Sequence, residues 1–290
     1  MANRDDKLPV SILIHTLNEE KNIRNCLETV KWADEIILID MYSDDKTVEI
    51  ASEYTDKIFY HERMGYADPA RQFGLEKASK NWILIVDADE LVPLRLKHRL
   101  ESIITDDLGD IISIPHNNYF FGKLMRFTGW GPLQDTHHRF FKKEYVFISE
   151  NIHSTFTERE DARIYAITDE NEGFIHFNYV NVEHFLEKFN RYTTIEAKAL
   201  FEADEDIKFR TALNQIFSEF RKRYIKLGGR KDGFRGFSLS FLMSTYRLVI
   251  YAKLKLMREY SSKNPAEKIE EEYKNLAKDV ITEYKKEIQE

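Results

Sequence analysis

Short apolar runs separated by amphipathic stretches dominate the first ninety residues. The runs have the length and composition of strands that are buried on both faces of a parallel sheet. They cover residues 10–14, 35–39, 57–60 and 82–86. Apolar positions at spacings of three and four between them predict helical crossovers, with Asn18 as a helix cap and Pro69 at a first helical position. This alternation predicts a doubly wound α/β domain that binds ligands at the carboxyl ends of its strands.

Three acids, Asp87, Asp89 and Glu90, directly follow the run 82–86. If the strand persists, Asp87 and Asp89 point the same way, because alternate residues of a strand share a face. Two converging carboxylates repel each other unless a cation lies between them. Mg²⁺ or Mn²⁺ suits such oxygen ligands and holds phosphates as well, so a metal and phosphate site is predicted here. A solvated acidic turn is the alternative interpretation.

Further polar residues follow the first two strands at the same edge of the predicted sheet. They are His15, Thr16, Asn18 and Asp40. The sequence contains neither a G-x-G-x-x-G motif after the first strand nor a P-loop, so a nucleotide would have to be held differently. We expect Asp40 to accept a hydrogen bond from a uracil or a ribose, while a metal on Asp89 takes the diphosphate.

Composition sets limits on the protein class. The chain has 290 residues, 42% hydrophobic and 32% charged, which is enough for a large core. Its apolar runs fall short of the roughly 18 residues that span a membrane, and its first residues are charged, so we expect a cytoplasmic protein. The single cysteine, Cys26, excludes an intramolecular disulfide and a cysteine-based zinc cluster. A net charge of −7 argues against a general nucleic-acid-binding protein.

The second part of the chain, residues 181–290, is predicted to be a helical extension of a domain at 1–180. Within it, residues 221–258 contain eleven basic residues and one acid, interleaved with aromatic and aliphatic side chains. This pattern favours a helix in the interface of an anionic membrane, and a buried helix with a basic rim is the alternative. Residues 265–290 form an amphipathic pattern that could pair with a second copy or fold back on the domain.

Five motifs together carry a resemblance to a known family. The first half contains VSILIHTLNEEKNIRNCLETVKWADEIILID and YADPARQFGLEKASKNWILIVDADE, and the second contains GWGPLQDTHHRFFKK, NIHSTF and HFNYVNVEHFLEKFNRYTTIEA. The first two resemble family 2 glycosyltransferases, which have the GT-A fold. The other three are similar to the bacterial lipopolysaccharide-core β-glucosyltransferase branch of that family.

The resemblance implies an inverting transfer of a sugar from a nucleotide donor, usually linked to UDP. The acceptor would be a glycan or a lipid-linked molecule of the cell envelope, met at the inner face of the membrane. By the same resemblance, Asp87 lies by the ribose, Asp89 binds the metal and Arg71 meets the diphosphate. The chain departs from its relatives at 70–72, which reads Ala-Arg-Gln in place of Q-R-N. It departs again at 152–154, which reads Ile-His-Ser in place of V-H-E.

An inverting transfer needs a general base that takes the proton from the acceptor hydroxyl. Asp135, in the predicted loop GWGPLQDTHHR, is our candidate, with His137 or His153 next and a turn-capping role as the alternative. Trp130 could stack on a sugar or simply pack, and Arg139 could meet phosphate with its fork of donors. Two other functions remain open: a sugar transferase for a peptide or another soluble acceptor, and a non-catalytic nucleotide-binding module.

Overall fold

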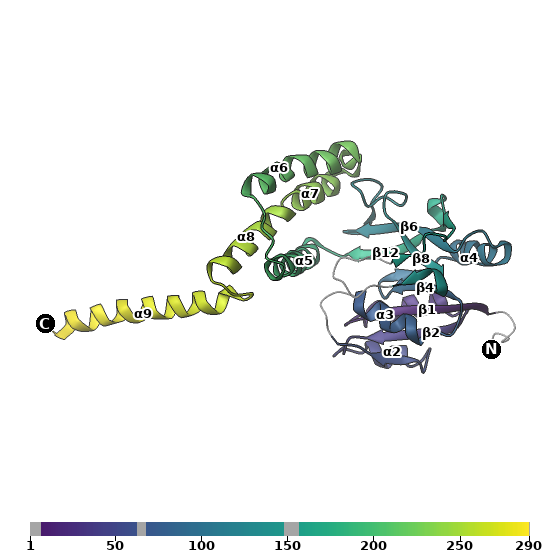
Figure 1. Ribbon diagram of the computed structural model, residues 1–290, viewed down its shortest axis with the longest axis horizontal. Helices are drawn as coiled ribbons and strands as arrows, with labels where there is room; N and C mark the ends of the chain where they lie inside the picture. The colour runs from purple at the N-terminus through teal and green to yellow at the C-terminus, as the bar shows by residue number, and fades with distance from the viewer. Residues whose placement is uncertain (1–6, 63–67, 148–156, 290) are drawn as a thin grey trace. The chain divides into compact units, whose positions relative to one another are not determined.

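The computed structural model describes residues 7–62, 68–147 and 157–289. The chain divides into two compact units. The first unit contains the residues up to Val182 together with Leu227–Phe237, and the second contains Glu183–Lys226 and the residues from Ser238 onward. Figure 1 labels the main strands and helices of both units.

A mixed sheet forms the first unit, with the strand order β3-β2-β1-β4-β8-β6-β12-β5 (Figure 1). Strands β3, β2, β1 and β4 are parallel to one another, β8 lies antiparallel between β4 and β6, β12 is parallel to β6, and β5 is antiparallel to β12. The strands of this path are β1 (Leu8–Thr16), β2 (Ala33–Asp40), β3 (Ile58–Tyr60), β4 (Trp82–Asp87), β5 (Glu90–Leu91), β6 (Ile111–Phe120), β8 (Thr136–Lys142) and β12 (Phe174–Tyr179). The short strands are β7 (Lys123–Leu124) and β11 (Ile164–Ala166), which pair with β6, and the pair β9 (Val146–Phe147) and β10 (Thr157–Glu158).

The four predicted strands and the α/β fold class are confirmed. In the register of the parallel strands, His15 lies beside Asp87 and Thr16 beside Asp40. The polar residues that follow these strands therefore meet at one edge, as the doubly wound pattern predicts. One expectation at this edge was wrong: β8 begins at Thr136, so His137, His138 and Arg139 lie on a strand and not in a loop.

Helices cover both faces of this sheet. Helices α1 (Ile23–Val30), α2 (Thr47–Ala51) and α4 (Leu94–Asp106) share one apolar core, whereas α3 (Asp68–Lys77) packs in the core on the opposite face. Ile12 and Ile14 of β1 point into the first core and Leu13 points into the second. Successive side chains of a strand point to opposite faces of the sheet, and both faces are buried here. The strands therefore have continuous apolar sequences.

Asn18 does not cap the first helix, which corrects the prediction. Helix α1 begins at Ile23, and Asn18 has a positive φ of 57° in the loop before it. Its side-chain Oδ1 accepts from the backbone N–H of Asp44 at 2.9 Å, and its own N–H donates to Ser43 Oγ at 2.9 Å. Asn18 therefore joins the loops that follow β1 and β2, because its short polar side chain tolerates the left-handed region.

The second unit is helical, as predicted. Helices α5 (Val182–Glu202), α6 (Phe209–Phe220) and α8 (Tyr246–Glu259) pack around a small core that includes Ala197, Ala212 and Leu254. The predicted C-terminal helix is α9 (Pro265–Gln289), whose Tyr273 and Leu276 are exposed. Among the described residues, the structure contains no helix that is long and apolar enough to cross a membrane.

The basic segment 221–258 is not one helix, contrary to the expectation. It consists of a π-helical turn η4 (Arg221–Lys226), a 3-10 turn η5 (Gly229–Asp232), α7 (Gly233–Ser244) and α8. Gly228 and Gly233 separate these elements with φ values of 76° and 64°, which favour glycine. Seven of the cations form ion pairs or hydrogen bonds within their own unit: Lys222, Arg223, Arg235, Arg247, Lys253, Lys255 and Arg258.

Candidate active site

Asp87 is bound by two arginines at the end of β4. Nη2 of Arg139 donates to Oδ2 at 2.8 Å, and Nη2 of Arg71, from α3, lies 3.5 Å from Oδ1. Burial alone would raise the pKa of Asp87, but the positive charges of Arg139 and Arg71 outweigh it and hold the pKa well below its usual range. Asp87 is therefore ionised, and it orients the two guanidinium groups that the sequence assigned to a diphosphate.

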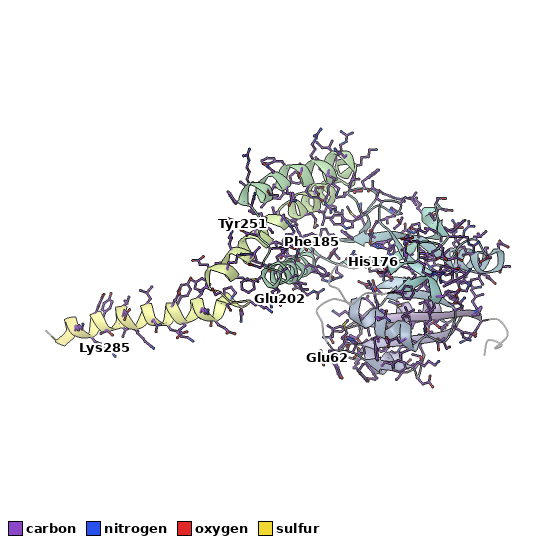
Figure 2. The ribbon with its side chains drawn as sticks, viewed as in Figure 1. Glu62, His176, Phe185, Glu202, Tyr251 and Lys285 are labelled. Carbon is purple, nitrogen blue, oxygen red and sulfur yellow. The ribbon has the colours of Figure 1, made fainter. Side chains whose placement is uncertain are left out.

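Asp89 lies in the turn between β4 and β5, so its direction is set by the turn and not by strand alternation. Its Oδ2 is 3.5 Å from Nε2 of His176, which projects from β12 (Figure 2). Burial would lower the pKa of His176, but the hydrogen bond to Asp89 and the neighbouring carboxylates raise it. The ionic partner of Asp89 in this structure is thus a histidine that favours its charged form.

The donor set around Asp89 fits one type of metal site. In the described part of the chain, no group of three or more His, Cys, Asp or Glu side chains is arranged to hold a metal ion. Asp87 is held by Arg139 at 2.8 Å, whereas Asp89 lies 3.5 Å from His176, so a cation would more readily replace the contact of Asp89. Mg²⁺ and Mn²⁺ commonly use one or two carboxylates and complete their coordination with substrate phosphates and water. The residues therefore fit a metal that is shared with a phosphate ligand, and they do not fit an all-protein metal cage.

Glu90 shapes the turn that presents these acids. It is fully buried, and its Oε2 accepts from the backbone N–H of Asp87 at 2.8 Å. Its Oε1 lies 3.1 Å from Nε2 of His116, a buried residue of β6. Burial lowers the pKa of His116. Glu90, in contact with His116, thus holds the backbone of the turn after β4, which makes Glu90 a structural residue of this site.

Asp135, the predicted base, lies at the start of β8. Its Oδ1 is 3.0 Å from Nε2 of His137, and its Oδ2 accepts from Nδ2 of Asn118 at 2.7 Å. Burial would raise the pKa of Asp135, but His137 and Asn118 lower it. At neutral pH the carboxylate is therefore ionised and can accept a proton.

A chain of side chains connects Asp135 to Asp89. Asn118 donates to Asp135, and its Oδ1 accepts from Nδ1 of His176 at 2.8 Å. The opposite nitrogen of His176 faces Asp89. Because Asn118 is fully buried and donates again to the carbonyl of Trp130 at 3.1 Å, its amide has one orientation. The predicted base and the predicted metal ligand thus belong to one polar network.

The structure also describes the surroundings of four other predicted residues: His15, Thr16, Asp40 and Trp130. His15 and Thr16 are buried at the end of β1. Both carboxylate oxygens of Asp40 bind Ser43, one to its N–H at 2.8 Å and the other to its hydroxyl at 2.5 Å, so Asp40 holds the turn after β2. Trp130 packs against Phe120 with ring centroids 5.1 Å apart. His153 lies outside the described residues.

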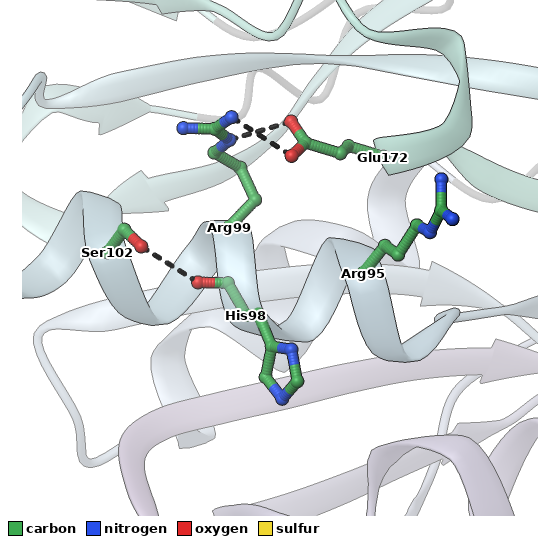
Figure 3. A pocket seen from close by; sticks show the side chains of 5 residues that line it. All are labelled: Arg95, His98, Arg99, Ser102 and Glu172. Atoms are coloured by element: carbon green, nitrogen blue, oxygen red, sulfur yellow. Dashed lines mark hydrogen bonds and ion pairs between the residues drawn. The ribbon is translucent and has the colours of Figure 1, made fainter.

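A separate surface hollow lies on α4 (Figure 3). It encloses about 280 Å³ and is lined by Arg95, His98, Arg99, Ser102 and Glu172. Arg99 donates to both carboxylate oxygens of Glu172, at 2.6 and 2.9 Å, so the charges that face the hollow are partly neutralised within it. The predicted site residues are not among its lining, and we assign it no role in the chemistry.

Asn118, His116 and His176 were missed in the sequence. Each is polar within a strand whose neighbours are largely apolar or aromatic, in IISIPHNNYF and in FIHFNY. A polar residue that interrupts a buried strand is a useful signal, because burial of such a group is costly unless it is hydrogen-bonded. The side-chain hydrogen-bond partners of these three residues, however, come from segments that are distant in the sequence.

Comparison with known proteins identifies the family. The model of glycosyl transferase family 2 matches residues 11–159, which is more than half of the chain. The chain belongs to glycosyl transferase family 2. The matched residues of this glycosyltransferase include Asp87, Asp89, Asn118, Asp135 and Arg139, whereas His176 of the network follows the matched segment.

Two relatives have sequences that align with most of this glycosyltransferase, and a third aligns with a smaller part of it. A lipopolysaccharide core biosynthesis glycosyltransferase of Rhizobium meliloti, LpsC, is 24% identical over 260 residues, which cover 86% of this chain and 92% of that protein. An uncharacterized glycosyltransferase of Rickettsia typhi is 27% identical over 291 residues, covering 93% and 94%. An uncharacterized glycosyltransferase of Escherichia coli, YibD, is 34% identical over 117 residues, covering 37% and 33%.

Solved structures with similarity include two bacterial enzymes. Residues 1–349 of S. aureus TarS in complex with UDP align with a TM-score of 0.46 and 18% identity, covering 92% of each chain. Glucosyl-3-phosphoglycerate synthase of Mycobacterium tuberculosis in complex with Mg²⁺ and UDP aligns with a TM-score of 0.36 and 18% identity. That alignment covers 47% of this chain and 57% of the synthase.

Proposed function

We propose that this glycosyltransferase moves a sugar, with inversion, from a nucleotide donor to a glycan or lipid-linked acceptor of the cell envelope. The observation that carries the proposal is the network from Asp135 through Asn118 and His176 to Asp89. It supports one site at which a base, Asp135, and a metal-binding acid, Asp89, act together. The resemblance of the motifs supports UDP as the nucleotide, and the name of the relative LpsC supports an acceptor in lipopolysaccharide core biosynthesis.

Asp135 is the proposed general base. The acceptor oxygen forms its bond to the anomeric carbon as the bond from that carbon to the diphosphate oxygen breaks, and the hydroxyl proton passes to the carboxylate of Asp135. The low pKa of Asp135 keeps it ionised before the reaction. Asn118 and His137 fix its two oxygens, so that the base is oriented before the acceptor arrives.

The donor side of the proposal rests on Asp89, Arg71 and Arg139. A Mg²⁺ or Mn²⁺ ion at Asp89 would supply positive charge that stabilises the leaving diphosphate. Each guanidinium group carries five N–H donors in a planar fork that matches phosphate oxygens, and both groups lie at Asp87 beside the proposed metal ligand. Fixed positive groups of this kind stabilise developing negative charge without reorganising during the reaction.

A lipid-linked acceptor calls for a surface that meets the membrane. In the second unit, exposed apolar and basic side chains alternate along α6 and η4, and we call this set the η4 patch. It consists of Phe217, Arg221, Lys222, Ile225 and Lys226. Phe217 is 78% exposed, which is unusual for a phenylalanine side chain. Apolar side chains among cations suit the headgroup region of an anionic bilayer, which supports peripheral membrane binding.

Pairing of two copies through α9 is the second proposed interaction. Its exposed apolar side chains recur at spacings of three and four residues along the helix, a pattern that suits a partner helix. They are Tyr273, Leu276, Val280 and Tyr284.

Product analysis tests the proposed function. The purified protein would be incubated with a panel of nucleotide sugars, Mn²⁺ and either a lipopolysaccharide core acceptor or a soluble glycan, and products would be identified by mass spectrometry. We expect transfer from a UDP-sugar, and at least a 100-fold loss in Asp135→Asn with unchanged donor binding. Asp169→Asn, in an exposed turn, is the matched control. Binding of UDP without transfer to any acceptor would indicate the non-catalytic module instead.

A further inference from the structure

The loop that leads to Asp135 is held by a segment almost a hundred residues further along the chain. Residues 227–237 belong to the first unit, although the chain on both sides of them belongs to the second. They contact the loop 126–135, which carries Trp130 and Asp135 and is followed directly by β8. We call residues 227–237 the clasp.

Asp232 makes the central contact of the clasp. Its Oδ1 accepts from the backbone N–H of Arg126 at 3.0 Å. Its Oδ2 accepts from the backbone N–H of Phe127 at 3.1 Å and from the hydroxyl of Thr128 at 2.7 Å. Three donors from consecutive residues thus converge on one carboxylate, and charge-assisted bonds of this type are stronger than neutral ones.

Leu227 and Gly228 hold the same loop from the beginning of the clasp. The carbonyl of Leu227 accepts from the N–H of Thr128 at 3.1 Å and from Nε2 of Gln134 at 3.3 Å. Gly228 lies against the ring of Phe127 so closely that a Cβ would be 2.8 Å from its Cδ1. Only glycine permits this approach, and only glycine readily adopts its φ of 76°.

The loop transmits these contacts to Asp135. Gly131 lies against Arg126, where an added Cβ would be 2.2 Å from the carbonyl oxygen. The N–H groups of Gln134 and Asp135 both donate to the carbonyl of Gly131, at 2.8 and 3.0 Å. The two ends of the loop are therefore in contact through Gly131. A shift at Arg126 displaces Gly131, and through it the backbone of Asp135.

We propose that Asp232, as the central residue of the clasp, is a positioning residue for Asp135. The proposal rests on the proposed role of Asp135 as the base. Thr128 illustrates the need for a clasp, because it is fully buried with a φ of 69°, a region that is unfavourable for a β-branched residue. Asp232 and Leu227 together bind its hydroxyl and its N–H, which stabilises this conformation.

Two measurements on Asp232→Ala test the clasp. Hydrogen exchange of peptides that cover 126–135 should become at least about tenfold faster, while exchange in β4 stays as in the wild type. The kcat should fall about 10- to 100-fold, because a displacement of about 1 Å has effects of this size on catalysis. The KM for the nucleotide sugar should stay within about twofold, since the donor side does not involve the loop.

Control variants separate the clasp from general destabilisation. Asp161→Asn changes an exposed aspartate of the same unit, which pairs with Arg159 at 2.7 Å, and should alter neither exchange nor kcat. Thr128→Val removes one of the three bonds to Asp232 and should give a smaller effect of the same kind. It carries the test if Asp232→Ala does not fold.

The outcomes distinguish the clasp from the proposed function. Unchanged exchange at 126–135 in Asp232→Ala would overturn the clasp whether or not transfer is observed. Faster exchange with an unchanged kcat would overturn the positioning role. A wild-type protein that transfers no sugar refutes the proposed function, and with it the positioning role, but leaves the exchange result as the measure of the clasp.

Discussion

Glu35 provides a stability prediction that can be worked out from the structure. It lies near the start of β2, and its carboxylate is buried. It accepts from the Ser11 hydroxyl, from Ser79 N–H at 2.8 Å and from Ser79 Oγ at 2.9 Å. Nζ of Lys57 donates to it as well, at 2.5 Å. The carboxylate therefore joins β1, β2 and the start of β4 at the end of the sheet opposite the active site.

The pKa of Glu35 sets the size of the effect. Burial would raise this pKa, but the donors from Lys57, Ser11 and Ser79 lower it from 4.5 to about 2. At about 1.36 kcal/mol for each pKa unit, the difference corresponds to about 3.4 kcal/mol. Lys57 is half-exposed, so water screens its share, and we expect about 2 kcal/mol. Because the folded pKa is the lower one, this stability is present above pH 4.5 and is lost as the pH falls toward 2.

Urea unfolding of Glu35→Gln measures this contribution. The three tryptophans, at positions 32, 82 and 130, all lie in the first unit, so their fluorescence reports its unfolding. At pH 7 the variant should lose about 2 kcal/mol, because a glutamine amide places N–H donors against the donors of Ser79 and Lys57. Asp34→Asn, which changes an exposed neighbour paired with Lys80, should lose less than about 1 kcal/mol.

The acid dependence gives the sharper result. Wild type should lose stability between pH 4.5 and pH 3 more steeply than Glu35→Gln, so that the two unfolding curves converge at low pH. If the two proteins differ by the same amount at pH 7 and pH 3, the linkage reasoning is wrong. If they do not differ at pH 7, the four donors do not stabilise the ionised carboxylate.

Three further predictions concern the site and the second unit. Asn118→Asp places a second carboxylate beside Asp135, and the repulsion between the two should raise the pKa of the pair. The acid limb of the kcat/KM profile should therefore move up by about 1 to 3 pH units. An acid limb that does not move would exclude Asp135 as the base. Changing the three cations of the η4 patch to Glu should abolish sedimentation with anionic liposomes at low salt and keep transfer to a soluble acceptor; wild type that stays in the supernatant would refute membrane binding. Leu276→Glu on α9 should halve the mass seen by analytical ultracentrifugation, whereas a monomeric wild type would exclude the pairing.

The sequence predicts the parallel half of the sheet because the signals for it are local. Each apolar run is followed within a few residues by the polar side chains of the ligand edge, so the run 82–86 is enough to place Asp87. The antiparallel insertion of β8 was not predicted, because its pairing with β4 and β6 depends on contacts between residues that are 21 or more positions apart. For the same reason the sequence offers Asp135 as a candidate base but does not reveal Asn118, which donates a hydrogen bond to it.

The C-terminal part was predicted in kind but not in arrangement. Periodicity predicts the helices that became α5 and α9, and the charge count correctly marks 221–258 as basic. The charge count does not show which cations have partners, and seven of the eleven form ion pairs or hydrogen bonds inside their own unit. The glycines at 228 and 233 were the signal in the sequence against one continuous helix, because glycine is unfavourable inside a helix. In the structure each of them has a positive φ.

Calorimetry with UDP tests the central claim most directly, namely that the edge after β4 is a nucleotide-sugar site at which Asp89 binds the metal that meets the diphosphate. We expect wild type to bind UDP in the presence of Mn²⁺ and much more weakly in its absence. Asp89→Ala should lose the Mn²⁺-dependent part of the affinity while its unfolding curve stays close to that of the wild type, because Asp89 lies in a turn outside the core. Equal UDP affinity of the two proteins in Mn²⁺ would contradict the account.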